Sequence, residues 1–118
     1  MKICYIAHPI GGDVGDNLML VRDIIRNINL TEPDVVPFCS WYADVRAMDD
    51  NVIEERRRGM KNNEFLLRKG FVDELHLYGP RISSGMDAEI AIAMEMGIKI
   101  VNKSEFIKDT DIIKAGNK

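Results

Sequence analysis

One glutamate is a candidate for chemistry because of the residues that surround it on a predicted helix. Ser84 can cap a helix that ends at Gly97, with Asp87 as the acidic half of a capping box. At 100° per residue, the helical neighbours of Glu89 are all apolar or small: Gly85, Met86, Ile92, Ala93 and Met96. A carboxylate in that arc loses hydration, so it needs either a partner or a chemical role.

Both roles are open for this carboxylate on the residues alone. In a structural role, Glu89 would reach a buried arginine or main-chain donors. In a chemical role, it would serve the cleavage of an N-glycosidic bond, which passes through an oxocarbenium-like state. A nearby carboxylate stabilises that state and can trap it covalently. A partly desolvated glutamate near a helix start, behind a serine-glycine turn, suits that requirement.

Other candidate residues follow the first predicted strand and the second. His8 could act as an acid or a base, or could be a polar loop residue. Trp41 could stack on a planar ligand, or could cover the helix behind it. Gly11 and Gly12 match neither a dinucleotide fingerprint nor a P-loop. Backbone donors at these glycines could hold a phosphate or a ribose, and a simple turn is the alternative.

The elements that must position these residues alternate along the chain. Apolar runs predict four strands, at residues 3–7, 35–38, 75–78 and 98–101. Apolar periodicity and capping residues predict helices at about 17–29, from a cap at Asp49 or Asp50 to Lys69, and from Ser84 to Gly97. Residues 40–49 are predicted to be a long loop. The tail from Ser104 is predicted to hold one or two helical turns, with Thr110 as a possible cap.

Strands that alternate with helices predict an α/β fold with one domain over residues 1–118. Right-handed crossovers then favour a three-layer, doubly wound parallel sheet of about four to five strands, Rossmann-like or flavodoxin-like. In such sheets ligands bind beyond the carboxyl ends of the strands. This rule gathers residues 8–15, 40–44 and 79–89 at one edge, together with Asn102 as a further candidate for substrate binding.

Composition narrows the classes of partner. The 118 residues are 46% hydrophobic and 30% charged, as in soluble globular proteins, and the net charge of −3 gives no footprint for nucleic acid. The basic cluster of residues 56–58 follows two glutamates and indicates a solvated helix face. Cys4 and Cys39 lack metal-ligand spacing, so we expect a reduced, cytoplasmic chain without a metal site. No apolar run is long enough for a membrane span.

Two segments carry a resemblance to a known family. Residues 4–13 read Cys-Tyr-Ile-Ala-His-Pro-Ile-Gly-Gly-Asp, and residues 83–89 read Ser-Ser-Gly-Met-Asp-Ala-Glu, with Ala93 and Gly97-Ile98 following. These segments resemble the nucleoside 2-deoxyribosyltransferase-like superfamily, and most closely a small domain common in phages and bacteria. The resemblance covers nearly the whole chain.

The resemblance implies roles for individual residues. Glu89 matches the nucleophile that attacks the anomeric carbon of a nucleoside, and Tyr5 matches a tyrosine that orients it. Ser83 stands where relatives contact sugar or phosphate, beside Ser84 and Gly85. The glycine loop matches a region that lines the ligand pocket. Relatives complete their sites with a neighbouring subunit, which implies at least a homodimer. We expect no cofactor.

One departure from the family pattern concerns the proton donor. Relatives present an aspartate on the strand before the serine block, and residues 74–78, Glu-Leu-His-Leu-Tyr, offer no match. Asp44 is the substitute that we consider first. We therefore expect an enzyme that cleaves or transfers the glycosyl group of a nucleoside or nucleotide. The alternative is a protein that binds or sequesters a nucleotide without turnover.

Overall fold

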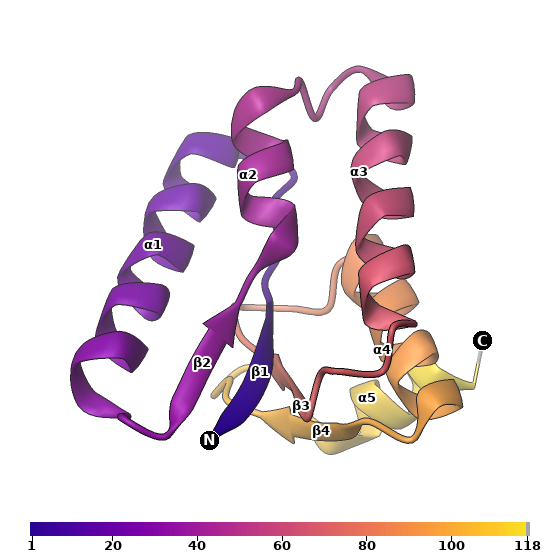
Figure 1. Ribbon diagram of the computed structural model, residues 1–118. Coiled ribbons are helices and arrows are strands. Elements are labelled where there is room, and N and C mark those ends of the chain that lie inside the picture. Colours follow the sequence, from indigo (N-terminus) through magenta and orange to yellow (C-terminus); the bar gives the residue numbers. More distant parts are fainter. Residues whose placement is uncertain (118) are drawn as a thin grey trace.

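Four parallel strands form a single sheet in the computed structural model, which describes residues 1–117 (Figure 1). The elements run in this order: β1 (Lys2–Ala7), α1 (Val14–Thr31), β2 (Val35–Phe38), α2 (Ser40–Ala47), α3 (Ile53–Leu67), β3 (Glu74–Leu77), α4 (Ser84–Met96), β4 (Lys99–Asn102) and α5 (Asp109–Gly116). Among these helices, none has the length and apolar character that crossing a membrane requires.

The strand order is β2-β1-β3-β4, which confirms the predicted parallel α/β fold. The chain runs to β2 on one side of β1 and returns to β3 and β4 on the other side. Right-handed crossovers therefore put α1 on one face of the sheet, and α2, α3 and α4 on the opposite face. Pro37 lies within β2, which is an edge strand where the missing N–H is tolerated.

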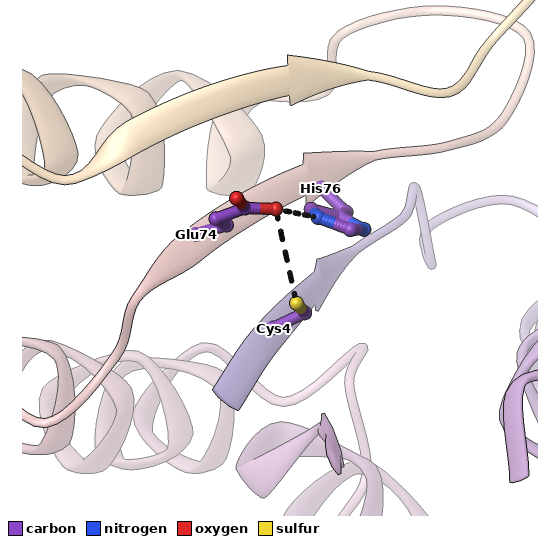
Figure 2. Close-up of side chains that lie close together, drawn as sticks. All are labelled: Cys4, Glu74 and His76. Carbon is purple, nitrogen blue, oxygen red and sulfur yellow. Dashed lines mark hydrogen bonds and ion pairs between the residues drawn. The ribbon is translucent and has the colours of Figure 1, made fainter. Parts of the chain in front are cut away.

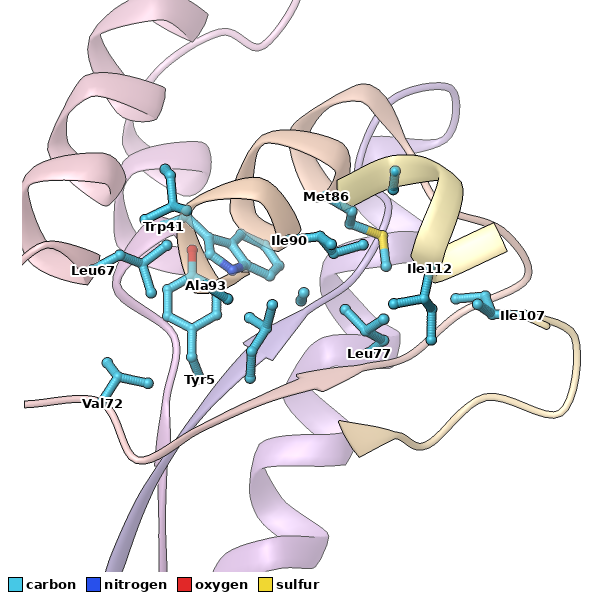
Figure 3. Close-up of a cluster of buried hydrophobic side chains, with 14 of the residues drawn as sticks. Tyr5, Trp41, Leu67, Val72, Leu77, Met86, Ile90, Ala93, Ile107 and Ile112 are labelled. Carbon is cyan, nitrogen blue, oxygen red and sulfur yellow. The ribbon is translucent and has the colours of Figure 1, made fainter. Parts of the chain in front are cut away.

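The main core lies between the sheet and the α2–α4 layer. Tyr5 of β1 pairs in register with Leu75 of β3, and Ala7 pairs with Leu77, so all four side chains point to the same face. There they meet buried side chains from the helices, among them Trp41, Leu67, Met86, Ile90 and Ile112 (Figure 3). Because β1 is buried on both faces, its sequence is a continuous apolar run and not an alternating one.

Two helices begin at caps that differ from the predicted positions. Ser83, and not Ser84, caps α4: its Oγ accepts a hydrogen bond from the backbone N–H of Met86 at 3.3 Å. The predicted end of this helix is confirmed, because Gly97 has the left-handed φ of 71°. Helix α1 begins earlier than predicted, at Val14, because Asp13 Oδ1 accepts from the N–H of Asp16.

The loop predicted for residues 40–49 is wrong over its first eight positions, which form α2. Trp41 explains the difference. This side chain is buried, and its indole N–H donates to the Ile6 carbonyl at 2.9 Å, so tertiary packing holds a segment of weak local preference in a helix.

Asp49 and Asp50 do not cap the next helix. Helix α3 begins after Val52 and ends at Leu67, two residues before the predicted end. The Asp49 carboxylate instead accepts from the N–H of Asn51 at 2.9 Å, within the turn between α2 and α3. In the tail, α5 begins after Lys108, not at Thr110, and the Asp111 carboxylate accepts from the Lys108 N–H at 3.1 Å.

The position of the α4 cap gives a direct test of this register. We expect Ser83→Ala to lower the free energy of unfolding by about 1 kcal/mol, because it removes the acceptor for the Met86 N–H. Ser84 is exposed, and we expect Ser84→Ala to change stability by less than about 0.5 kcal/mol. Urea denaturation of both variants measures the difference. Equal losses, or a larger loss for Ser84→Ala, would contradict the observed cap.

Candidate active site

Glu89 projects from α4 toward the central strand of the sheet. The Tyr5 hydroxyl, which rises from β1, donates a hydrogen bond to Glu89 Oε2. Tyr5 is fully buried, and Glu89 is partly buried. Within residues 1–117 no ion pair joins Glu89 to an arginine, so the partner of this carboxyl group is a phenol. The buried ion pair considered from the sequence is absent from the described part of the chain.

The helical arc around Glu89 is largely as predicted. Met86, Ile92 and Ala93 are buried, while Met96, near the helix end, is exposed. Glu95 lies on the solvated side of α4 and pairs with Arg68 at 3.0 Å. The core-facing arc of α4 therefore carries one carboxyl group, that of Glu89.

Loss of hydration dominates the electrostatics of this carboxyl group. Burial raises the pKa of Glu89 to about 8, and the hydrogen bond from Tyr5 opposes that rise. The side chain keeps a partial opening, yet surrounding protein atoms replace most of the water near the carboxyl oxygens. Burial, and then the neighbouring charge of Glu89, hold the pKa of Tyr5 well above its usual value. Burial likewise raises the pKa of the nearby Cys39 thiol.

A cavity of about 620 Å³ opens beside Glu89, between α2, α3, the start of α4 and the end of β1. That volume lies in the range of sites for small organic ligands. Most of the residues singled out from the sequence line it: His8, Gly11, Trp41, Asp44, Ser83, Ser84, Gly85 and Glu89. The cavity sits beyond the carboxyl end of β1, where the parallel-sheet rule places ligands.

Three candidates do not line the cavity. Tyr5 lies behind Glu89 and contacts it through the hydrogen bond from its hydroxyl group. Gly12, with a φ of 94°, belongs to the turn between β1 and α1. Asn102 lies at the end of β4, where its side-chain amide donates to the Ile107 carbonyl at 2.7 Å and its oxygen accepts from the Ser104 N–H. The structure therefore gives Asn102 a place in the connection to α5.

His8 is buried at the wall of the cavity, and its ring is oriented by the main chain. Nδ1 lies 2.7 Å from the Pro9 carbonyl, which accepts its proton and leaves Nε2 without one. Burial lowers the pKa of His8, so the neutral ring is the favoured form. In that form His8 accepts a hydrogen bond or a proton at Nε2.

Asp44 and Trp41 reach the cavity from α2. Asp44 Oδ2 accepts from the Asn62 side-chain amide at 3.2 Å, which holds the carboxylate against α3. Trp41 is fixed to the sheet through its bond to the Ile6 carbonyl, so it forms a rigid wall. A planar ligand in the cavity would meet a buried side chain that is anchored by a hydrogen bond.

One face of α3 also lines the cavity, and sequence reasoning missed it. Arg56, Met60, Asn63 and Leu67 recur at helical spacing along this face. Arg56 donates to Ser84 Oγ at 3.0 Å, which joins α3 to the start of α4. The basic cluster of residues 56–58 is exposed, as predicted, but Arg56 and Arg57 also line the cavity. The sequence shows the helical spacing of these residues, but it does not show that this face of α3 points toward the cavity.

A small network behind the carboxyl group was also missed. Ser40 donates to Asn63 Oδ1 at 2.9 Å, which links the first turn of α2 to α3. Ser40 also interacts with the Tyr5 phenol. These contacts hold the phenol in place beneath Glu89, and nothing in the spacing of Ser40 or Asn63 predicts them.

Chemically, the site holds a carboxyl group that changes charge near neutral pH. Below about pH 8 the protonated form of Glu89 predominates, and above that pH the carboxylate predominates. The protonated form donates or accepts hydrogen bonds, and the ionised form attacks an electrophilic carbon. A pKa in this range, in a cavity with polar walls, is typical of functional sites.

One comparison with known proteins found a match that covers this region. A family model described as a domain of unknown function (DUF7768) matches residues 2–103, a span that includes Tyr5, Glu89 and the residues lining the cavity. No curated protein and no solved structure matches the chain.

The raised pKa of Glu89 predicts a specific dependence of stability on pH. Between the usual glutamate pKa of 4.5 and the folded value of about 8, the unfolded chain has lost a proton that the folded protein retains. The contribution of Glu89 to the free energy of unfolding is therefore full below pH 4.5, falls as pH rises to about 8, and is constant above that value. We expect the stability of Glu89→Gln relative to the parent to increase across this interval, as measured by urea denaturation.

Two further variants sharpen this measurement. Tyr5→Phe removes the hydrogen bond that lowers the Glu89 pKa, so in that variant the decline should extend above pH 8. Glu105→Gln removes an exposed carboxylate, and its free energy of unfolding relative to the parent should not vary with pH across this interval. A difference between Glu89→Gln and the parent that does not vary with pH would mean that Glu89 titrates as an ordinary glutamate.

Proposed function

We propose that the chain, which belongs to the DUF7768 family, cleaves the N-glycosidic bond of a nucleoside or nucleotide with Glu89 as nucleophile. One observation carries the proposal. A single desolvated carboxyl group, held by a buried phenol, faces a cavity of about 620 Å³. Such a carboxylate suits the stabilisation and capture of an oxocarbenium-like centre.

The reaction begins with attack of ionised Glu89 on the anomeric carbon. A bond forms between a carboxylate oxygen and that carbon, while the bond from the carbon to the base nitrogen breaks and the base leaves with the electron pair. A proton from an acid or from water neutralises the leaving base. Water then displaces the glycosyl group from Glu89 to give the free sugar, or a second base displaces it to give a new nucleoside.

Tyr5 positions the nucleophile in this scheme. Its hydroxyl bonds to Oε2, which leaves Oε1 of Glu89 for the substrate and favours the ionised form. Positive charge that develops on the sugar also favours ionisation, because opposite charges stabilise each other strongly where water is scarce. Asp44 is the acid that we assign to the leaving base, since its carboxyl group lines the same cavity.

The lining offers complementary surfaces for the parts of a nucleoside. Trp41 gives a planar apolar wall for a base, and Ser83 and Ser84 bring hydroxyl groups to the sugar side. Arg56, Arg57 and Arg81 also line the cavity and suit a 5′-phosphate. The proposal takes the roles of Glu89, Tyr5 and Ser83 from the resemblance to nucleoside 2-deoxyribosyltransferase-like proteins.

A second candidate function is nucleotide binding without turnover, and the protonation of Glu89 favours it. With a pKa of about 8, most Glu89 carboxyl groups in the empty cavity are protonated at pH 7. A neutral carboxylic acid is a hydrogen-bonding group, not a nucleophile. One oxygen of the Asp44 carboxylate already accepts a hydrogen bond from the Asn62 amide, so only the other oxygen is free to meet a leaving base. The two functions therefore differ in whether bound substrate drives ionisation of Glu89.

A base-release assay separates the two functions. Incubation with deoxynucleosides, their 5′-monophosphates and NAD should yield free base, detected by chromatography. Glu89→Gln should reduce release by several orders of magnitude, because the amide cannot attack the anomeric carbon. Glu105→Gln is the control, because Glu105 is exposed and does not line the cavity. Release that persists unchanged in Glu89→Gln would contradict the nucleophile, and tight binding without release by the parent would favour the binding protein.

The proposal includes a second copy of the chain beside the cavity. Met60 lines the cavity and is 41% exposed, and Ile53, on the same helix, is 59% exposed. The resemblance implies that a neighbouring subunit completes the site, and these exposed side chains of α3 are the surface that we assign to that contact. Light scattering at micromolar concentration should give a mass of at least two chains, and Ile53→Glu should lower it. A monomeric parent would contradict completion of the site by a neighbour.

A further inference from the structure

A second cluster of reactive side chains lies on the sheet face opposite the Glu89 cavity. Glu74 and His76 are two residues apart on β3, so strand alternation puts them on one face. Cys4 of β1 is the register partner of Glu74 and shares that face. Figure 2 shows the three side chains converging across the β1–β3 pair. Their ligand atoms all lie within 4.8 Å of one another.

The cluster is buried and its polar atoms face inward. Cys4 is fully buried, His76 is 5% exposed, and the Glu74 side chain is 12% exposed. Glu74 Oε1 lies 2.8 Å from His76 Nε2 and 3.9 Å from Cys4 Sγ, so one carboxylate oxygen is central to the group. A thiol, an imidazole and a carboxylate that meet in a buried position supply three different metal-ligating atoms.

These separations are close to those around a tetrahedral zinc ion. Ligand bonds of 2.0–2.3 Å place neighbouring nitrogen, oxygen and sulfur ligands about 3.3–3.6 Å apart. The two contacts of Glu74 Oε1, at 2.8 and 3.9 Å, fall on either side of that range. Each Glu74 separation is therefore within about half an ångström of the range for zinc, and all three pairs of ligand atoms lie within 4.8 Å.

We propose that Cys4, Glu74 and His76 bind one Zn²⁺ ion, with water as the fourth ligand. The mixed sulfur, nitrogen and oxygen set suits zinc, whereas calcium and magnesium prefer oxygen ligands alone. On binding, the Cys4 thiol releases its proton to solvent and the thiolate sulfur bonds to the ion. His76 coordinates through Nε2, and its proton resides on Nδ1.

Lys2 is the cation that competes for Glu74, and its placement leaves room for zinc. Its Nζ lies 3.0 Å from Oε2, whereas the cluster uses Oε1. The Lys2 side chain is 60% exposed, so it can stay on Oε2 or move into solvent. The neighbouring Asp73 carboxylate adds negative charge at the same edge and accepts from the Ile3 N–H at 2.8 Å.

The zinc ion would join β1 to β3, the two central strands. It lies on the other face of the sheet from Glu89, so its role is structural and does not depend on the proposed glycosidase function. Binding to the folded state alone stabilises a protein as ligand concentration rises. Zinc should therefore raise the melting temperature of the chain.

Cobalt titration of the full chain tests the site directly, since Co²⁺ takes similar ligands and is coloured. Chelator-washed, reduced protein should bind one equivalent of Co²⁺ and show a near-ultraviolet thiolate-to-cobalt charge-transfer band, which Zn²⁺ then abolishes. Cys4→Ser should remove the band. Cys39→Ser should retain it, because Cys39 is the matched control on the other side of the sheet. The absence of a band in the parent, or its loss only in Cys39→Ser, would overturn the proposal.

Two further variants and a second measurement test the site even if the Cys4→Ser protein fails to fold. Glu74→Gln and His76→Gln should each weaken Zn²⁺ binding by at least about tenfold, because even partners outside the ligand set contribute that much. Calorimetry measures the affinity, and circular dichroism checks the fold. Glu89→Gln should bind Zn²⁺ as the parent does. Unchanged affinity in both ligand variants would contradict the site, and base release by the parent is a separate outcome that tests only the glycosidase.

Discussion

The hydrogen bond between Tyr5 and Glu89 joins the central strand of the sheet to the helix that carries the candidate nucleophile. It satisfies two polar groups that burial would otherwise penalise, in a region packed with Trp41, Ile90 and Leu67. The contact also determines how Glu89 behaves, since it counteracts the desolvation that raises the pKa. The placement and the charge of Glu89 therefore depend on one phenol at the second position of the buried part of β1.

Strand alternation in β1 separates two kinds of chemistry. Tyr5 and Ala7 face the α2–α4 layer, and Cys4 and Ile6 face the α1 side. The same alternation in β3 puts Leu75 in the main core and His76 on the opposite face. One strand pair thus lies beneath the Glu89 cavity on one face and carries a cluster of side chains with metal-ligating atoms on the other. The sheet separates the two groups, so a change in one leaves the other in place.

The cavity owes its shape to a helix pair on one side of the sheet. Helices α2 and α3 return the chain from β2 across β1 to β3, and their turn stands above the carboxyl end of β1. Arg56 donates to Ser84 and Ser40 donates to Asn63, so polar contacts link α2, α3 and α4 beside the cavity. Buried side chains such as Trp41 therefore line the inner part of the cavity, and exposed side chains such as Met60 line its outer part.

The sequence by itself determined the parallel α/β fold, the buried arc of α4 and the gathering of His8, Ser83 and Glu89 at one edge, because these follow from local periodicity and from strand direction. Tertiary structure alone decided the rest. It made residues 40–47 a helix through the burial of Trp41, turned one face of α3 toward the cavity, and gave Glu89 a phenol for a partner. It also brought Cys4 to Glu74 across 70 residues of chain. Each of these depends on contacts between segments distant in sequence, and desolvation, which sets the pKa of Glu89, exists only once those segments pack together.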